Sequence, residues 1–108
     1  MTTVIAAIAL LFGAVLPAKA QPGPVTLTLR NHQFAPARIE VPAGQRVELH
    51  VINADDSAEE FESADLHRER VIPARQEVVI YVGPLKPGSY DFIGEFNPQT
   101  ARGQIVAK

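Results

Sequence analysis

The feature that most constrains the fold of this chain is an alternation of apolar and polar residues with period two, repeated in short runs between Pro and Gly residues. Residues 25–30 alternate throughout, and in residues 45–53 Val47, Leu49 and Val51 share one parity while His50 lies on the other. Such alternation is typical of β-strands that place one face on a core and the other in solvent. The pattern therefore predicts a sheet protein, with His50 on a solvent-facing surface.

The remaining runs and turns indicate the fold class. Further strands are predicted over residues 38–41, 75–82, 90–95 and 103–107. Pro42-Ala-Gly44 and the segment 83–88 supply turn residues between strands. No long helical period is present. About seven short strands joined by Pro and Gly turns predict an all-β, Greek-key antiparallel β-sandwich.

The first twenty residues are typical of a secretory signal peptide. Residues 4–16 are almost wholly apolar, and Ala18-Lys19-Ala20 gives the small-x-small pattern that precedes cleavage. We therefore expect a signal peptide at residues 1–20 and one domain at residues 21–108, exported from the cytoplasm. An uncleaved anchor is the alternative, although the apolar run is shorter than the roughly 20 residues that span a bilayer.

The net charge and the absence of sulfur ligands restrict which partners and which metal ions the domain can bind. Residues 21–108 hold nine Lys and Arg against twelve Asp and Glu, a net charge of 9 − 12 = −3, which argues against a nucleic-acid partner. The chain has no Cys, and its one Met is Met1. A metal bound by the domain must therefore accept imidazole nitrogen or carboxylate and carbonyl oxygen.

Two stretches carry the candidate site. Seven of the twelve acidic residues fall in residues 53–70. In an extended chain Glu60 and Glu62 point to one side and Phe61 to the other, so that Phe61 anchors the stretch in the core. Glu95 stands beside Phe96 in the same way. We expect the two stretches to meet at one end of the sandwich and to form a carboxylate metal site.

Two further ligands are weaker candidates. Glu69 closes the acidic stretch, and His67 is its one histidine. The alternatives are that the acidic stretch is a solvated loop paired with Arg68 or Arg70, and that His67 is an exposed loop residue.

The order of several motifs resembles the cupredoxins over essentially the whole of residues 21–108. These motifs are Phe34-x-Pro36, Ile39-x-Val41-Pro-Ala-Gly44, Val47-x-Leu49-x-Val51-x-Asn53, Pro87-Gly88-x-Tyr90-x-Phe92 and Gly103-x-Ile105-Val106. The resemblance implies copper ligands at four positions. This chain has Gly94 at the Cys position, Asn97 at the second His, Ala101 or Arg102 near the Met, and no His within residues 57–61. A type 1 blue copper centre is therefore not expected.

A narrower resemblance concerns proteins of bacterial iron uptake. Glu60-Phe-Glu62-Ser63, Leu66-x-x-Glu69 and Gly94-Glu-Phe-Asn97-Pro are similar to EfeO-type cupredoxin-like proteins and the small periplasmic partners of ferrous-iron permeases. In many of those proteins His stands at the Asn97 position. The resemblance implies a periplasmic protein that binds iron or copper and assists iron oxidation or delivery to an inner-membrane iron permease.

Other functions stay open at this stage. The acidic stretch also suits a metal-free docking module for a basic partner, and the fold suits a structural sandwich domain of an envelope assembly. No nucleophile–base pair is evident, so a stand-alone enzyme is not expected.

Overall fold

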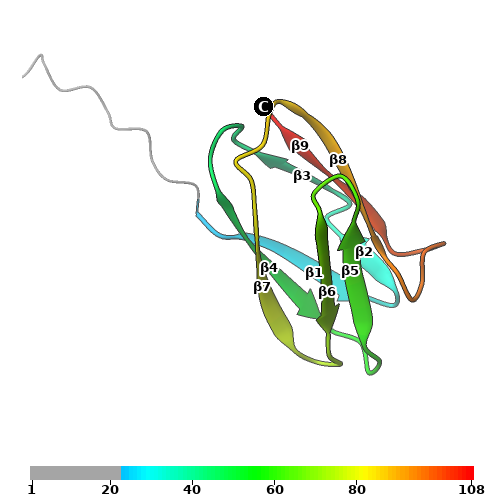
Figure 1. Cartoon of the computed structure of the whole chain (residues 1–108). Coiled ribbons are helices and arrows are strands. Elements are labelled where there is room, and N and C mark those ends of the chain that lie inside the picture. Colours follow the sequence, from blue (N-terminus) through cyan, green and yellow to red (C-terminus); the bar gives the residue numbers. More distant parts are fainter. Residues whose placement is uncertain (1–22) are drawn as a thin grey trace, which may run out of the picture.

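The computed structural model describes residues 23–108 as two β-sheets packed face to face (Figure 1). The predicted signal peptide, residues 1–20, lies outside the described residues. The strands are β1 (Val25–Arg30), β2 (Gln33–Ala35), β3 (Arg38–Val41), β4 (Val47–Asn53), β5 (Glu59–Ser63), β6 (Arg68–Ile72), β7 (Glu77–Val82), β8 (Gly88–Gly94) and β9 (Arg102–Ala107). None of the described segments is a helix long and apolar enough to span a membrane.

The sheets are mixed, which the sequence did not predict. One sheet has the order β2-β1-β4-β7 and the other β3-β9-β8-β5-β6. Most neighbours are antiparallel, but β1 pairs with β4 and β3 pairs with β9 in parallel. The chain leaves the first sheet after β2, forms β3 in the second sheet and returns to β4, and such a crossover places β4 parallel to β1. The all-β sandwich is confirmed, with nine strands where about seven were predicted.

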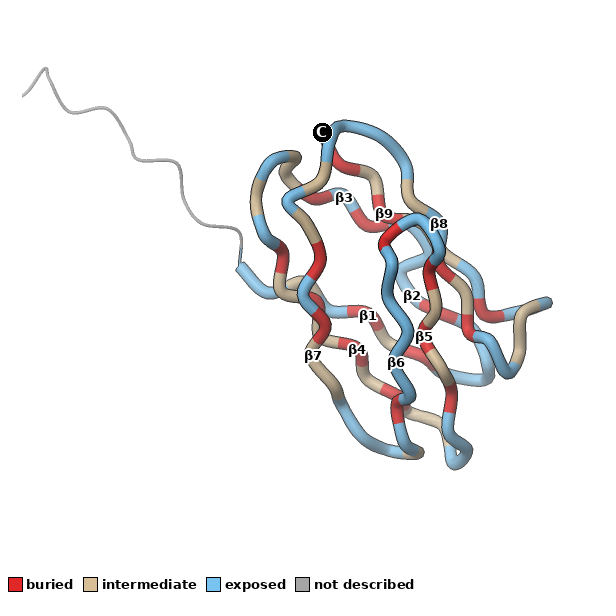
Figure 2. The backbone as a smooth tube through the Cα atoms, in the orientation of Figure 1, coloured by how far each residue is buried: buried red, intermediate tan, exposed pale blue. Residues whose placement is uncertain are grey.

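Strand alternation places the core between the two sheets. In β4 every second residue, from Val47 to Asn53, is buried, and the intervening residues are half-exposed (Figure 2). Three aromatic rings, those of Phe34, Phe61 and Phe92, pack against one another in the core. Their centroids lie 5.0 to 6.3 Å apart, within the range of favourable aromatic contacts.

The acidic stretch, expected to be a loop, forms the antiparallel hairpin β5–β6. Glu59, Phe61 and Ser63 face inward and are buried, whereas Glu60 and Glu62 face outward. Acidic residues on both faces of β5 hide the period of two, because the buried Glu59 stands where an apolar residue is expected. β5 lies beside β8 in the interior of its sheet, and β6 forms the sheet's edge.

Arginine side chains bridge the flank of the sandwich where β6 and β7, the last strands of the two sheets, lie near one another. Arg68 Nε donates to the carbonyl oxygen of Tyr81 at 2.9 Å. Arg70 Nη1 donates to the carbonyl oxygen of Val79 at 3.5 Å. Both guanidinium groups are thereby directed toward the other sheet.

Candidate functional site

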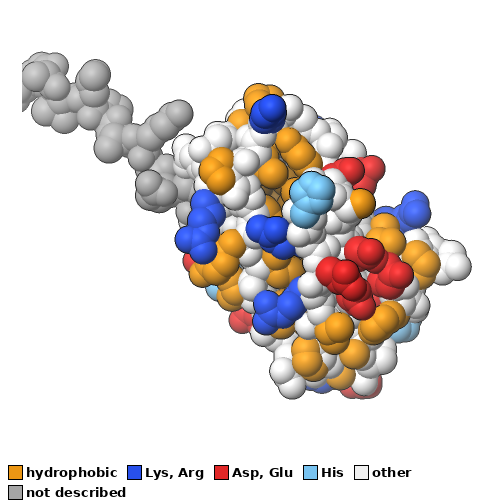
Figure 3. Space-filling model, viewed as in Figure 1, with side chains coloured by type: hydrophobic (Ala, Val, Ile, Leu, Met, Phe, Trp, Pro, Cys, Tyr) orange, Lys and Arg blue, Asp and Glu red, His pale blue; other side chains and the backbone are white. Residues whose placement is uncertain are grey.

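Four glutamates occupy one outward surface of the second sheet, which we call the acidic face: Glu60, Glu62, Glu69 and Glu95. Glu62 and Glu69 are directly opposite one another in the β5–β6 pairing. Glu95 follows β8, and its N–H donates to the carbonyl oxygen of Glu60 at 2.8 Å. Figure 3 shows acidic side chains gathered on this side of the molecule. Residues more than thirty positions apart in the chain therefore supply neighbouring carboxylates.

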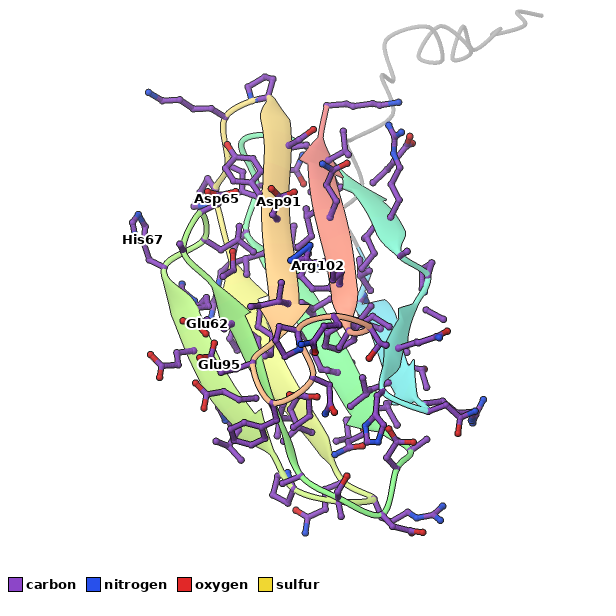
Figure 4. The ribbon with its side chains drawn as sticks, turned by 90° about the vertical axis from the view of Figure 1, so that its right-hand side faces the viewer. Glu62, Asp65, His67, Asp91, Glu95 and Arg102 are labelled. Carbon is purple, nitrogen blue, oxygen red and sulfur yellow. The ribbon has the colours of Figure 1, made fainter. Side chains whose placement is uncertain are left out.

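Glu62 and Glu95 line the same hollow. It has a volume of about 410 Å³ and lies over β5 and β8, with Asp65 and Asp91 also on its wall. Figure 4 shows Glu62 and Glu95 close together, with Asp65 and Asp91 further along the strands. The expected approach of the two stretches is thus observed. It occurs on the outer surface of a sheet, however, and not at the end of the sandwich.

The acidic face has no neutralising cation within the described part of the chain. None of its four glutamates forms an ion pair with a Lys, Arg or His among residues 23–108. The pKa of Glu60 is raised, first by contact with the Glu69 carboxyl, then by partial burial, and then by the negative charges of Glu69, Glu95 and Glu59. Like charges thus oppose ionisation at this surface.

The alternative was that Arg68 or Arg70 pairs with the acidic stretch. The described residues show no such ion pair with the acidic face, because both arginine side chains are directed toward β7. His67 lies in the turn between β5 and β6, has a positive φ of 57° and is exposed. Figure 4 shows it pointing away from Glu62 and Glu95. The structure therefore brings together Glu60, Glu62, Glu69 and Glu95, and His67 lines a second hollow together with Glu62 and Glu69. Within residues 23–108, no three His, Asp or Glu side chains are already arranged to hold a metal ion.

Sequence reasoning missed Glu59, which is 1% exposed. One carboxylate oxygen, Oε1, accepts the N–H of Phe96 at 2.7 Å and the N–H of Glu60 at 3.0 Å. The other, Oε2, accepts Nδ2 of Asn97 at 2.7 Å. The signal that points to Glu59 is its parity, which it shares with Phe61.

Glu59 is in the segment for which the cupredoxin resemblance implies a copper-ligating His. It falls within residues 57–61, and Asn97, at the position of the second His, is its hydrogen-bond partner. A Cβ atom on Gly94, the Cys position, would lie 2.7 Å from the Glu59 carboxyl carbon and 2.7 Å from Ala101 Cβ. Asn97 and Gly94 thus lie against the Glu59 carboxylate, and Ala101 lies beside Gly94.

A separate polar cluster lies on the outer surface of the first sheet. His50 Nδ1 contacts Glu77 Oε1 at 2.9 Å, and its Nε2 contacts Glu48 Oε2. Hydrogen bonds to Glu48 and then to Glu77 raise the pKa of His50. The predicted surface position of His50 is confirmed, with two carboxylate partners.

Comparisons with known proteins agree with this architecture. Residues 3–107 match the family described as cupredoxin-like domain. The chain is 44% identical over 82 residues to an uncharacterized protein of Rickettsia prowazekii, a match that covers 76% of this chain and 66% of that protein.

Solved copper proteins share the fold at low sequence identity. The metal-binding domain of the Cu(I)-exporting P-type ATPase CopA of Streptococcus pneumoniae, solved with Cu(I), superposes with a TM-score of 0.70 at 18% identity, covering 79% of this chain and 84% of that one. Amicyanin of Paracoccus versutus gives a TM-score of 0.62 at 16% identity, covering 86% and 85%.

Proposed function

Because the chain belongs to the cupredoxin-like domain family, we propose that it binds a metal ion, and that it does so through the acidic face and not through a type 1 copper centre. The chain has no Cys to supply the thiolate of such a centre. The positions where the family resemblance places copper ligands hold Gly94, Asn97 and Ala101, which provide neither thiolate nor imidazole. The acidic face is the alternative source of donors.

The observation that carries this proposal is the gathering of four glutamates on one sheet surface without an ion pair to a cation among the described residues. The pKa of Glu60 is raised at this surface. A bound cation would remove the repulsion and would lower that pKa. Glu60, Glu62, Glu69 and Glu95 are side chains on a surface, so rotamer changes can bring their oxygens together. Binding would therefore order these side chains around the ion, which costs conformational entropy.

The donor set favours hard ions. Carboxylate oxygens without thiolate or thioether suit Fe(II), Fe(III) or Mn(II), and they also accept Cu(II). The more highly charged Fe(III) gains most from anionic oxygen, so that the acidic face would favour oxidation of bound Fe(II). Such oxidation needs an electron acceptor from another molecule, and the protein is therefore proposed as an accessory and not as a stand-alone enzyme.

The proposed setting follows from the signal-like segment at residues 1–20 and from the resemblance to iron-uptake proteins. In this proposal the domain acts in the periplasm and passes iron to an inner-membrane iron permease. Copper remains the second candidate ion, since the superposable domain of CopA was solved with Cu(I).

Isothermal titration of the protein tests the metal proposal. Fe(II) under anaerobic conditions, Fe(III) as a soluble chelate and Cu(II) are each titrated into the wild type and into a Glu62→Ala/Glu95→Ala double variant. We expect binding heat for at least one ion in the wild type and its loss in the variant. A Glu48→Ala/Glu77→Ala double variant removes the same charge from the opposite sheet and should bind like the wild type. Equal heats in all three proteins would contradict the proposal.

A second function, docking to a basic protein partner without metal, is favoured by exposed apolar residues beside the acidic face. Phe96 is 53% exposed and Val71, opposite Glu60 in the hairpin, is 47% exposed. Apolar side chains flanked by charge are typical of protein-binding surfaces. Complex formation of this kind would weaken with salt and would be unaffected by a chelator, whereas metal-dependent function would be lost with the chelator.

A further inference from the structure

The Glu59 carboxylate is the one side-chain group that joins β5 to the loop between β8 and β9 by hydrogen bonds in the described structure. Its two oxygens accept N–H groups from Phe96 and Asn97 of the loop and from Glu60 of its own strand. All three donors are neutral amides, and Glu59 forms no ion pair among the described residues. The carboxylate is therefore held by amide dipoles alone.

Burying a carboxylate is costly unless its oxygens are hydrogen-bonded, and removing water from the group costs several kcal/mol. Charged hydrogen bonds recover more of this cost than neutral ones. A glutamate that is 1% exposed and has donors on both oxygens thus makes loop closure depend on those donors. If the loop opens, Glu59 loses the contacts from Phe96 and Asn97 together.

The local backbone is fitted to this carboxylate. The Gly94 N–H donates to the carbonyl oxygen of Ala101 at 2.8 Å, and the Ala101 N–H donates to that of Asn97 at 2.9 Å, so the loop is also closed on itself. A Cβ on Gly94 would approach Glu59 Oε2 to 2.9 Å, nearer than unbonded atoms pack. A residue larger than glycine at position 94 would displace either the Glu59 carboxyl group or the Ala101 side chain.

The same arrangement disfavours a cation. The N–H groups of Phe96, Glu60 and Asn97 direct their positive hydrogens at both carboxylate oxygens, as donors around a bound anion do. Three of the roughly four acceptor sites of the carboxylate are thus taken, and a metal ion bound through both oxygens would displace at least one donor and leave an N–H group unpaired. The residues at the family's copper-ligand positions therefore do not fit a copper ion.

We propose that Glu59 replaces the metal centre of the fold, and that its carboxylate fastens the β8–β9 loop to β5 independently of any metal. The inference does not depend on metal binding at the acidic face, because it concerns the inner side of β5. Glu59 is thereby assigned as a residue that positions Phe96 at the surface and supports Glu95, whose own N–H donates to the Glu60 carbonyl oxygen.

Amide hydrogen exchange of the full chain, followed by nuclear magnetic resonance, tests this proposal. In Glu59→Ala and in the milder Asn97→Ala, we expect the Phe96 amide to exchange on the order of tenfold to a hundredfold faster, the range that loss of a hydrogen bond to a charged group gives. Glu59→Gln keeps one oxygen acceptor and should exchange at an intermediate rate. Glu60→Ala, at the neighbouring outward position, should leave the Phe96 amide as protected as in the wild type.

The same exchange experiment tests whether a metal ion contributes to closure of the β8–β9 loop. A chelator added to the wild type should leave exchange of the Phe96 amide unchanged, and Cu(I) or Cu(II) should not protect it further. Unchanged protection in both Glu59→Ala and Asn97→Ala would overturn the proposal. So would copper binding that is abolished by Asn97→Ala and retained in Glu62→Ala/Glu95→Ala, whereas loss of binding only in the latter variant concerns the acidic face.

Discussion

At the scale of single residues, the direction of each glutamate on β5 decides its chemistry. Glu59 and Glu60 are neighbours in sequence, but strand geometry sends one into the core and the other to the surface. Glu59 has N–H donors on both oxygens, whereas Glu60 has carboxylates as its principal electrostatic neighbours. The two residues therefore respond in opposite ways to loss of their charge.

Glu60→Gln is expected to stabilise the protein at neutral pH because it removes repulsion from Glu69 and Glu95. The pKa of Glu60 is raised in the folded protein. The stability that this raised pKa gives the folded protein is therefore complete below the unfolded pKa of about 4.5, where Glu60 is protonated. It is lost as the pH rises through the folded pKa and the side chain becomes charged. The advantage of the variant, measured by urea unfolding, should be present at pH 7 and should disappear toward pH 4.

Glu40→Gln is the matched control with the opposite sign. Lys108, by a hydrogen bond and by its charge, lowers the pKa of Glu40 in the folded protein. That substitution should therefore destabilise at pH 7. A Glu60→Gln variant that is less stable than the wild type at pH 7 would show that the carboxylates of the acidic face do not repel one another.

At the scale of elements, sequence patterns predicted the apolar strands well and the acidic hairpin poorly. The alternation in β1 and β4 is visible because their inward residues are apolar. In β5 a buried Glu59 and a buried Ser63 take inward positions, since both find hydrogen-bond partners in distant strands and loops. Those partners, the Asp91 carbonyl and the Phe96 and Asn97 amides, could not be known before the fold.

The candidate site, like the strands, was predicted from the sequence only in part. Glu60 and Glu62 were placed on one side of β5 by parity alone, and β5 bears this out. The position of the acidic face on a sheet surface was not predicted, because it depends on β5 pairing with β8. The turn that positions His67 has no Gly or Asn at its positive-φ position, since His67 itself takes the positive φ.

The β8–β9 pairing contains a close contact that tests the register. Gly103 is opposite Phe92, and a Cβ at this position would lie 2.3 Å from the Phe92 ring and 3.0 Å from the Ala37 carbonyl oxygen. Gly103→Ala should therefore cost about 1–3 kcal/mol of unfolding free energy, the usual range for overpacking a core. Gly23→Ala, with nothing within 4 Å, is the control. Equal stabilities would show that Phe92 does not lie over Gly103.

The contact between β4 and β7 has a pH dependence of its own. Glu48 and Glu77 raise the pKa of His50, so the stabilisation is complete below the unfolded pKa of about 6.5 and is lost as pH rises through the folded value. The stability difference between the wild type and His50→Gln should be largest near pH 6 and should shrink toward alkaline pH. A difference that grows with pH would contradict the assignment of these partners.

At the scale of the whole molecule, Asn53 joins the two sheets. It ends β4 in the first sheet and is 1% exposed. Its Nδ2 donates to the carbonyl oxygens of Ser57 and of Ile72, which ends β6 in the second sheet, and its Oδ1 accepts the N–H of Asp55. One side chain thus fixes the crossover from β4 into the hairpin.

Asn53→Ala should lower the unfolding free energy by about 1–3 kcal/mol, because it removes a buried hydrogen bond to the Ile72 carbonyl oxygen and part-buried hydrogen bonds to Ser57 and Asp55. Chemical denaturation measures the loss. Gln33→Ala, at an exposed position of β2, should change stability little. A loss in Asn53→Ala no larger than in Gln33→Ala would mean that water replaces the amide at this junction.

The arginines that bridge β6 and β7 have a consequence for solubility. An unpaired strand edge is a template on which a second molecule can add a strand, the first step toward fibrils. Here the guanidinium of Arg68 already occupies the Tyr81 carbonyl oxygen of such an edge, and Arg70 reaches that of Val79. We therefore expect these two arginines to hinder edge-to-edge aggregation on this side. The same two side chains, directed toward β7, leave the acidic face without a counterion among residues 23–108.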